Sequence, residues 1–345
     1  MSKWTTGELA TFITLKRGYD LPQQKRANGN VPIFSSSGIS GRHSEAMVSA
    51  PGVITGRYGT IGQVFYAAED YWPLNTTLYV EDFHGNDALF MYYFLKTLEW
   101  DKFTSASAVP GINRNTVHKE IVTVPDLDTQ RTIAGYLSLL DKKIQTNTRI
   151  NDNLQQQAQA IYTAMFISNA DPAWEQGRLY DLITVKYGKD HKKLADGAYP
   201  VFGSGGIMRY VERPLYTGES VLIPRKGTLN NVMYVNEPFW SVDTMFFTEM
   251  KIPNVAKFVF HFVKSKDLAS MNAGSAVPSM TTDILNALEL AIPSADRLAE
   301  FESVVAPMYQ TMQVNNRESA KLAELRDTLL PKLMSGEMDV SSIQV

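Results

Sequence analysis

The sequence contains no cysteine, which excludes disulfide bridges, thiolate metal sites and a cysteine nucleophile. The absence fits a reducing compartment, and we expect a cytoplasmic protein. No apolar run approaches the ~18 residues that a membrane span needs, and the first residues carry no apolar signal segment. The sequence therefore predicts a protein that has no membrane partner.

A large excess of charge of either sign is also missing, since 33 basic and 36 acidic residues give a formal net charge of −3. This balance excludes a protein coated with basic residues. It leaves a nucleic-acid-binding protein open, because affinity for phosphates depends on where the cations lie and not on their sum. With 345 residues, of which 44% are hydrophobic, the chain is long and apolar enough for two globular domains.

Motifs that carry catalysis are missing as well. The sequence has no Gly-x-x-x-x-Gly-Lys phosphate loop, and its five histidines lack metal-ligand spacing. The segment 236–239 resembles the Asn-Pro-Pro-aromatic motif of amino-methyltransferases, but Glu237 occupies a required proline, so we interpret it as a turn. Asp126 and Asp128 resemble a nuclease carboxylate pair, but helix capping explains Asp126 better. We therefore predict that this chain has no catalytic residue, no metal site and no cofactor of its own.

What the sequence does contain is a long internal repeat. Trp4–Leu9 returns as Trp174–Leu179, which is a shift of 170 residues, and Val31–Ile39 returns as Tyr199–Ile207, a shift of 168. The shift of 168 persists to the second half of each copy, where Leu154 matches Leu322. A constant shift over most of the chain indicates two copies of one structural unit.

Each copy reads as a strand-rich domain followed by a long helix. Val53–Thr55 and Val221–Ile223 are short apolar strands that run into Gly-rich turns. The apolar runs 90–95 and 258–263 predict a buried core helix rather than a platform for stacked bases. We expect a mixed α/β (α+β) fold divided into a first domain, a central helix, a second domain and a C-terminal helix with tail, at residues 1–125, 126–170, 171–293 and 294–345.

The segments after the domains carry heptad stripes. Apolar or small polar residues alternate at spacings of four and three from Ile133 to Met165, and the equivalent positions from Phe301 to Leu333 repeat the pattern. Arg326 fits this stripe poorly, and Leu325 is an alternative core residue. The predicted core of the helix pair is Leu137, Leu140, Ile144, Asn147, Leu154, Ile161, Val305, Met308, Met312, Asn315, Leu322 and Leu329.

Two details of these helices suggest that they pair with each other. Asp126 and Ser294 are equivalent, and both suit a helix N-cap. Asn147 and Asn315 are equivalent polar residues in mid-stripe, and such residues fix the register of a coiled coil. We expect an antiparallel coiled coil and a pseudo-twofold chain; two unrelated amphipathic helices are the alternative. A helix over residues 129–167 spans roughly 58 Å at ~1.5 Å per residue. That length corresponds to roughly 17 base pairs of DNA, so two domains held by such a helix pair could be spaced by one DNA turn.

Several motifs together resemble one known family. Each domain carries an Arg-x-Gly-Thr element, at residues 57–60 and 225–228. The central helix begins with the run from Val124 to Ile133, and the chain closes with the run from Leu333 to Met338. These features make the chain similar to the specificity subunit of type I restriction–modification systems. One departure from the family is that the start of the second helix lacks the equivalent of Gln130. The surfaces on which partner subunits would dock along the two helices are therefore not strictly equivalent.

The resemblance implies two target recognition domains that each read one half of a bipartite, asymmetric site in double-stranded DNA, with the helices as spacer. It implies two methyltransferase subunits docked on the helices and restriction subunits recruited to the complex. S-adenosylmethionine is then expected in the methyltransferase partner and not in this chain.

Candidate DNA contacts are loop residues that supply cations for phosphates or polar groups for base edges. The equivalent segments 105–110 and 274–279 are further candidates for DNA contact or simple turns. In the first domain the candidates are Lys16, Arg17, Lys25, Arg26, Ser36, Ser37, Arg57, Tyr58 and Thr60. In the second they are Lys186, Lys189, His191, Lys192, Lys193, Ser204, Arg209, Arg225, Lys226, Asn230 and Asn231.

Two other functions stay open at this point. A self-contained DNA methyltransferase would need a cofactor loop and a catalytic motif that the sequence does not show. A pseudo-symmetric protein-binding adaptor without a DNA role is compatible with the nearly neutral charge. Weakening of DNA binding by rising salt would distinguish the DNA reader from the adaptor.

Overall fold

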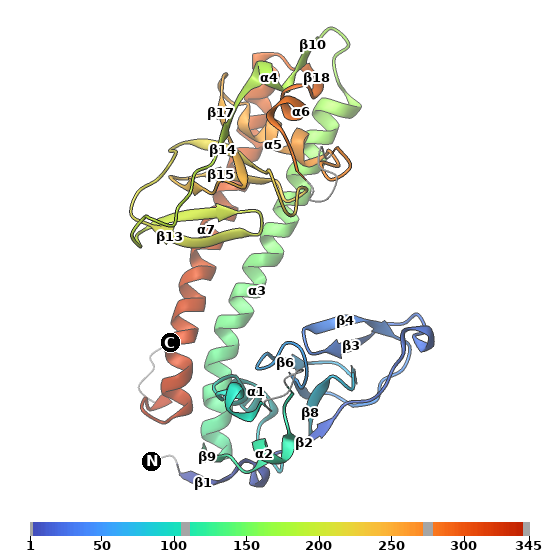
Figure 1. The fold of residues 1–345 in the computed structure, drawn as a ribbon, viewed down its shortest axis with the longest axis vertical. Coiled ribbons are helices and arrows are strands. Elements are labelled where there is room, and N and C mark those ends of the chain that lie inside the picture. The colour runs from blue at the N-terminus through green and yellow to red at the C-terminus, as the bar shows by residue number, and fades with distance from the viewer. Residues whose placement is uncertain (1–2, 105–110, 272–278, 341–345) are drawn as a thin grey trace. The chain divides into compact units, whose positions relative to one another are not determined.

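The computed structural model describes residues 3–104, 111–271 and 279–340. Its contacts divide the chain into two compact units (Figure 1). The first unit is formed by Met1–Asn147 and Asn316–Val345, and the second by Thr148–Asn315. Each unit therefore contains one domain together with one half of each long helix. No helix within the described residues is both long and apolar enough to cross a membrane.

Within its described part, the first unit has sheets of two, four and three strands (Figure 1). The order is β2-β8-β5-β6 in the four-stranded sheet, β4-β3-β7 in the three-stranded sheet and β1-β9 in the pair. Two helices accompany them, α1 (Ala88–Lys96) and α2 (Arg114–His118). The strands are β1 (Trp4–Glu8), β2 (Thr14–Arg17), β3 (Val31–Ser35), β4 (Gly38–His43), β5 (Gly52–Gly56), β6 (Val64–Ala67), β7 (Trp72–Pro73), β8 (Thr77–Asp82) and β9 (Ile121–Pro125).

The second unit repeats this plan, with sheets β11-β17-β14-β15, β13-β12-β16 and β10-β18 among its described residues. Its short helices are α4 (Leu179–Leu182), α5 (Ala256–Lys264) and α6 (Thr282–Asn286). The repeat inferred from the sequence is thus present in the fold. The strands are β10 (Glu175–Arg178), β11 (Ile183–Tyr187), β12 (Tyr199–Gly203), β13 (Gly206–Val211), β14 (Glu219–Pro224), β15 (Met233–Asn236), β16 (Trp240–Ser241), β17 (Met245–Met250) and β18 (Glu289–Ile292).

The aromatic runs form core helices, as the sequence predicted. Phe90 and Phe94 of α1 are buried, and so are Phe258, Phe260 and Phe262 of α5. Burial removes these rings from any contact with a nucleic-acid base. β15 ends at Asn236 and residues 237–239 connect it to β16, with Phe239 fully buried, so the segment is a connection between strands, as we expected.

The long helices are α3 (Leu127–Thr163), which continues as a π-helical turn over Ala164–Ser168, and α7 (Ala295–Met334). Both N-caps are as predicted: the carboxylate of Asp126 accepts from the Thr129 amide at 3.0 Å, and the Ser294 hydroxyl accepts from the Arg297 amide at 3.3 Å. The amides of Thr129 and Lys3 hold the pKa of Asp126 below its usual value. Asp126 is therefore a cap, as we interpreted it.

The heptad stripes of both helices are confirmed. Every stripe position from Ile133 to Met165 and from Phe301 to Leu333 is buried or half-buried. The helices run antiparallel inside each unit. In the first unit the Asn147 amide donates to Ser319 Oγ at 3.2 Å, and in the second the Asn315 amide donates to Asn151 Oδ1 at 2.8 Å. The polar residues predicted to set the register therefore meet polar residues of the opposite helix.

One expectation for the helices is wrong. Leu325 does not replace Arg326, because Leu325 is 47% exposed and Arg326 is half-buried in an ion pair with Asp141 at 2.6 Å. Gln130 is 2% exposed, and the inequality of partner docking on the two helices stays a prediction. Gln130 donates to Asn86 Oδ1 at 2.7 Å and to the Pro125 carbonyl at 2.8 Å, so it joins α3 to its own domain. The equivalent Leu298 is buried in the second core.

Candidate nucleic-acid interface

In the first unit, two turns that are distant in sequence lie against each other. One turn joins β3 to β4 and contains Ser36, and the other follows β5 and contains the Arg-x-Gly-Thr element. A Cβ placed on Gly59 would lie 3.3 Å from Ser36 Oγ. Gly59 has a φ of 80° and Gly38 a φ of 102°, so both turns use backbone conformations that favour glycine. The fold thus brings Ser36 together with Arg57, Tyr58 and Thr60, and we call this the first turn cluster.

Arg57 has a fixed backbone and a half-exposed side chain. Its amide donates to the Thr76 carbonyl at 2.8 Å, and its carbonyl accepts from the Ile112 amide at 2.9 Å. The guanidinium carbon lies 4.6 Å from the centre of the exposed Tyr58 ring. A cation stacked on an exposed ring is held in place but keeps its donors available. This arrangement suits contact with a phosphate or a guanine edge.

The second unit contains the same contact between two turns, although Arg225 lies over the ring of Tyr187, at 5.3 Å from its centre, and not over a neighbour in sequence. A Cβ on Gly227 would lie 2.8 Å from Ser204 Oγ, and the side chain of Asn231 donates to the Ser204 carbonyl at 2.7 Å. The Arg225 amide donates to the Thr244 carbonyl, and its carbonyl accepts from the Met280 amide, each at 2.9 Å. The second turn cluster therefore consists of Ser204, Arg225, Lys226, Gly227 and Asn231.

Several predicted cations are already paired with carboxylates. Lys16 forms an ion pair with Glu81, and the equivalent Lys186 forms one with Glu249 at 3.5 Å. Arg17 lies 3.6 Å from Asp20 and Arg209 lies 2.7 Å from Asp196. These pairs lower the attraction for phosphate, so the four residues are weaker candidates than the turn clusters. Their role in DNA binding stays a prediction.

The basic stretch 189–193 offers less constrained charge. Lys189, Lys192 and Lys193 are exposed and form no ion pair with a described residue. Asp190 accepts a hydrogen bond from the Lys192 amide at 3.0 Å, which lowers the pKa of the Asp190 carboxyl. The aspartate therefore shapes the turn that displays the lysines. His191 is half-buried beside them.

The remaining candidates divide between exposed and structural positions. Lys25 is exposed, and Arg26 is half-buried with Nη1 3.6 Å from the place of a Cβ on Gly41 in β4. Ser37 is exposed and its hydroxyl lies 3.2 Å from that of Ser35. Asn230 donates to Asp267 at 3.0 Å and accepts from the Ala269 amide at 3.0 Å, so it holds a neighbouring loop. Residues 105–110 and 274–278 lie outside the described part of the chain.

Sequence reasoning missed the exposed apolar side chains of β13. Ile207, Met208 and Tyr210 are 51%, 61% and 48% exposed. The signal for them was present, because three of the four residues that follow Gly205-Gly206 are large and apolar. A strand with one buried face would have alternated apolar and polar residues there.

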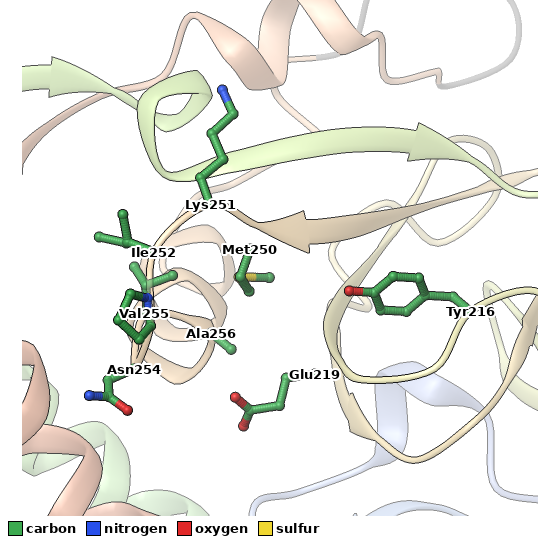
Figure 2. A pocket seen from close by; sticks show the side chains of 9 residues that line it. Tyr216, Glu219, Met250, Lys251, Ile252, Asn254, Val255 and Ala256 are labelled. Atoms are coloured by element: carbon green, nitrogen blue, oxygen red, sulfur yellow. The ribbon is translucent and has the colours of Figure 1, made fainter.

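A separate hollow of about 360 Å³ lies in the second unit, where β17 leads into α5 (Figure 2). The Tyr216 hydroxyl points toward it, and the Lys251 side chain points away. The Glu219 carboxylate at its wall is bound by Lys257 at 2.7 Å. Its lining comprises Tyr216, Glu219, Met250, Lys251, Ile252, Pro253, Asn254, Val255 and Ala256, and includes no predicted DNA contact.

Known proteins match this chain along most of its length. A family profile described as "Type I restriction modification DNA specificity domain" matches residues 1–156 and again 172–319. A putative type I specificity subunit of Mycoplasma pneumoniae is 26% identical, with 96% of each chain covered. A type I restriction enzyme specificity subunit of Methanocaldococcus jannaschii is 21% identical over 74% of this chain and 70% of its own length. The crystal structure of a type I S subunit from M. genitalium has the same fold, with a TM-score of 0.69, 19% identity and 96% coverage of both chains.

Proposed function

The chain belongs to the type I restriction–modification DNA specificity family, and on that premise we propose that its two turn clusters read the two halves of one split DNA sequence. The observation that carries this proposal is the repeated contact between a serine turn and an Arg-x-Gly-Thr turn, once in each unit. The framework is shared, but Tyr58 in one cluster is Lys226 in the other. Different side chains on one framework favour two half-sites of different sequence.

The basic segment beside the second cluster supplies the general attraction for DNA in this proposal. Lys189, Lys192 and Lys193 lie on one exposed turn, whereas the net charge of the whole chain is −3. Local clustering of cations lets a nearly neutral protein bind phosphates. Binding should accordingly weaken steeply as salt rises. If the chain bound no DNA at any salt concentration, a protein-binding adaptor would be favoured instead.

The chain acts in this proposal without a catalytic site of its own. The candidate motifs for catalysis have structural explanations, since Asp126 caps α3 and Phe239 lies in the core. Two methyltransferase subunits dock on the α3–α7 helix pair, and S-adenosylmethionine is held by them and not by this chain. Restriction subunits join that complex to form the nuclease.

Mapping of methylated bases in cells tests the proposal. One culture produces this chain with the modification subunit of its own system, and the control culture produces the modification subunit alone. We expect a new methylated motif of two short blocks separated by a fixed unspecified gap. No new motif, with both subunits present and bound to each other, would contradict the proposal.

Domain exchange tests the assignment of one half-site to each domain. Replacement of residues 1–125 by the corresponding domain of a relative should change one block of the motif and leave the other block and the gap unchanged. A replacement that altered both blocks, or neither, would contradict independent reading.

A further inference from the structure

β13 presents an apolar surface on the edge of a sheet. It lies outside β12 in the order β13-β12-β16, and its Ile207, Met208 and Tyr210 are about half exposed or more. Exposed apolar residues on an edge strand favour aggregation, and proteins generally avoid them unless the surface has a partner. The position of these residues therefore calls for a binding partner.

This surface is continuous with the second turn cluster. The Met208 side chain crosses the turn, so that a Cβ on Gly203 would lie 2.5 Å from Met208 Sδ. Gly203 directly precedes Ser204 of the cluster. In the first unit the equivalent pair is Ser35 and Ser40, both small and polar. Glycine at 203 thus makes room for a large apolar side chain that only the second unit carries.

Cations border the same surface. The Arg209 guanidinium donates to the Leu194 carbonyl at 3.0 Å, which joins β13 to the segment that carries Lys192 and Lys193. Both lysines are exposed. An apolar strip with a cationic border suits a DNA groove, where base edges that include the apolar methyl group of thymine lie between two rows of phosphates.

The chemistry of methionine limits what Met208 can recognise. Its thioether donates no hydrogen bond and accepts only weakly, so it cannot read the polar edge of a base pair. The C5 methyl of thymine is the apolar group that an unmodified base pair displays in the major groove. That groove admits β-strands, and β13 is the outer strand of the sheet β13-β12-β16, so it is the strand that can enter first.

We propose that β13 enters the major groove of the second half-site and that Met208, together with Tyr210, packs on thymine C5 methyl groups there. This inference rests on the proposed function. In the first unit β4 carries Ser40 and Arg42 at the positions equivalent to Met208 and Tyr210, and of the three apolar residues only Ile207 has an exposed apolar counterpart, Ile39. Met208 and Tyr210 are then specificity-determining residues of the second half-site.

Replacement of thymine by deoxyuridine tests the inference directly, since it removes the methyl and keeps base pairing. The motif is first mapped with the complex of this chain and its modification subunit. Affinity of that complex is then measured for duplexes in which the thymines of one half-site are replaced. We expect a loss of about fourfold per contacted methyl when the second half-site is changed, in keeping with burial of one methyl-sized group.

Two variants of Met208 serve as matched controls. Met208→Ser, which copies Ser40, should lose less affinity than the parent when deoxyuridine replaces thymine, because only Tyr210 still contacts a methyl group, whereas Met208→Leu should keep the full loss. Met208 is 61% exposed, so neither substitution disturbs the core. Deoxyuridine in the first half-site should affect all three proteins alike.

Two results would overturn the inference. One is a second half-site that contains only G·C pairs, and the other is an equal deoxyuridine effect in the parent protein and Met208→Ser. Both presuppose a split motif, so they leave the proposed function intact. Absence of any split motif would instead contradict the proposed function, and the inference with it.

Discussion

Equivalent residues of the two units make different polar contacts between domain and helix. In the first unit the Tyr93 hydroxyl donates to Asp141 at 2.6 Å, and Arg326 pairs with the same carboxylate. The equivalent residues of the second unit are His261 and Tyr309, which lie 2.9 Å apart. Each domain is therefore attached to its own helix segments by contacts that the other unit does not share.

Removal of Arg326 should destabilise the first unit. Arg326→Leu leaves the Asp141 carboxylate, 19% exposed, without its cation, and we expect a loss of about 1–3 kcal/mol in the free energy of unfolding. Urea denaturation measures this. Asp327→Asn is the matched control, because Asp327 also pairs with Arg326 but is 64% exposed, and its loss should cost about 0.5 kcal/mol or less. Equal effects of the two variants would refute the role given to Asp141.

His261 should make the second unit sensitive to acid. Burial, and to a smaller extent the charge of Lys264, lowers the pKa of His261 to about 3. Between these two pKa values the histidine, whose pKa is ~6.5 in the unfolded chain, is protonated in the unfolded chain and neutral in the folded chain. Stability should therefore fall by about 1.4 kcal/mol per pH unit as the pH drops below ~6.5 toward 3. His261→Gln keeps polar contacts with Tyr309 and Gln159, and its unfolding free energy should fall less steeply; parallel pH profiles would show that His261 is not the source.

At the level of elements, the helix pair was the most predictable part of the fold. A heptad stripe is a local pattern, so the positions from Ile133 to Met165 could be read directly. The roles of Gln130 and Arg326 could not, because Asn86 and Asp141, the partners that tie them to other elements, lie 44 and 185 residues away in sequence. The same limit applies to the candidate site. Arg57 and Ser36 were predicted separately, but only the packing of β3 and β5 brings their turns into contact.

The hydrogen-bonded pair of Asn151 and Asn315 should make the helix pair of the second unit less stable than an apolar pair at the same positions would. Asn315→Leu removes the amide that donates to Asn151 Oδ1, and we expect a loss of about 1–2 kcal/mol in the free energy of unfolding. The double variant Asn151→Leu/Asn315→Leu should recover that loss or exceed the parent in melting temperature, because apolar layers stabilise coiled coils. Thermal denaturation followed by circular dichroism compares the three proteins. Additive destabilisation in the double variant would contradict a paired layer.

At the scale of the whole molecule, the two repeated units differ in the contacts that join each domain to the long helices. In the second unit Lys257 is 3% exposed and bonds to Glu302 of α7 at 2.6 Å, whereas the equivalent residues of the first unit are Leu89 and Ala134. The units are alike in topology, but a domain moved to the other position meets foreign helix residues.

A chain with the first domain in both positions measures this difference. Leu89 would then face Glu302, and Tyr93 would face Tyr309, so we expect a lower melting temperature and less folded protein. The helix substitutions Glu302→Ala, Tyr309→Asp and Ala158→Arg recreate the surroundings that the domain has in its own unit. They should restore the melting temperature by several degrees. No improvement would mean that these contacts do not decide where a domain folds.

The division of each long helix between two units also has a consequence for inheritance. The compact units meet the rest of the chain at Asn147 and Asn315, inside α3 and α7, rather than at the domain edges near Pro125 and Ile292. Genes for such chains could exchange DNA specificity by recombination. A crossover in the codons for the middle of α3 keeps Asp141 with Tyr93, and one in the middle of α7 keeps Glu302 with Lys257. The codons around Asn147 and Asn315 are thus the positions at which two such genes can be joined so that the product still folds.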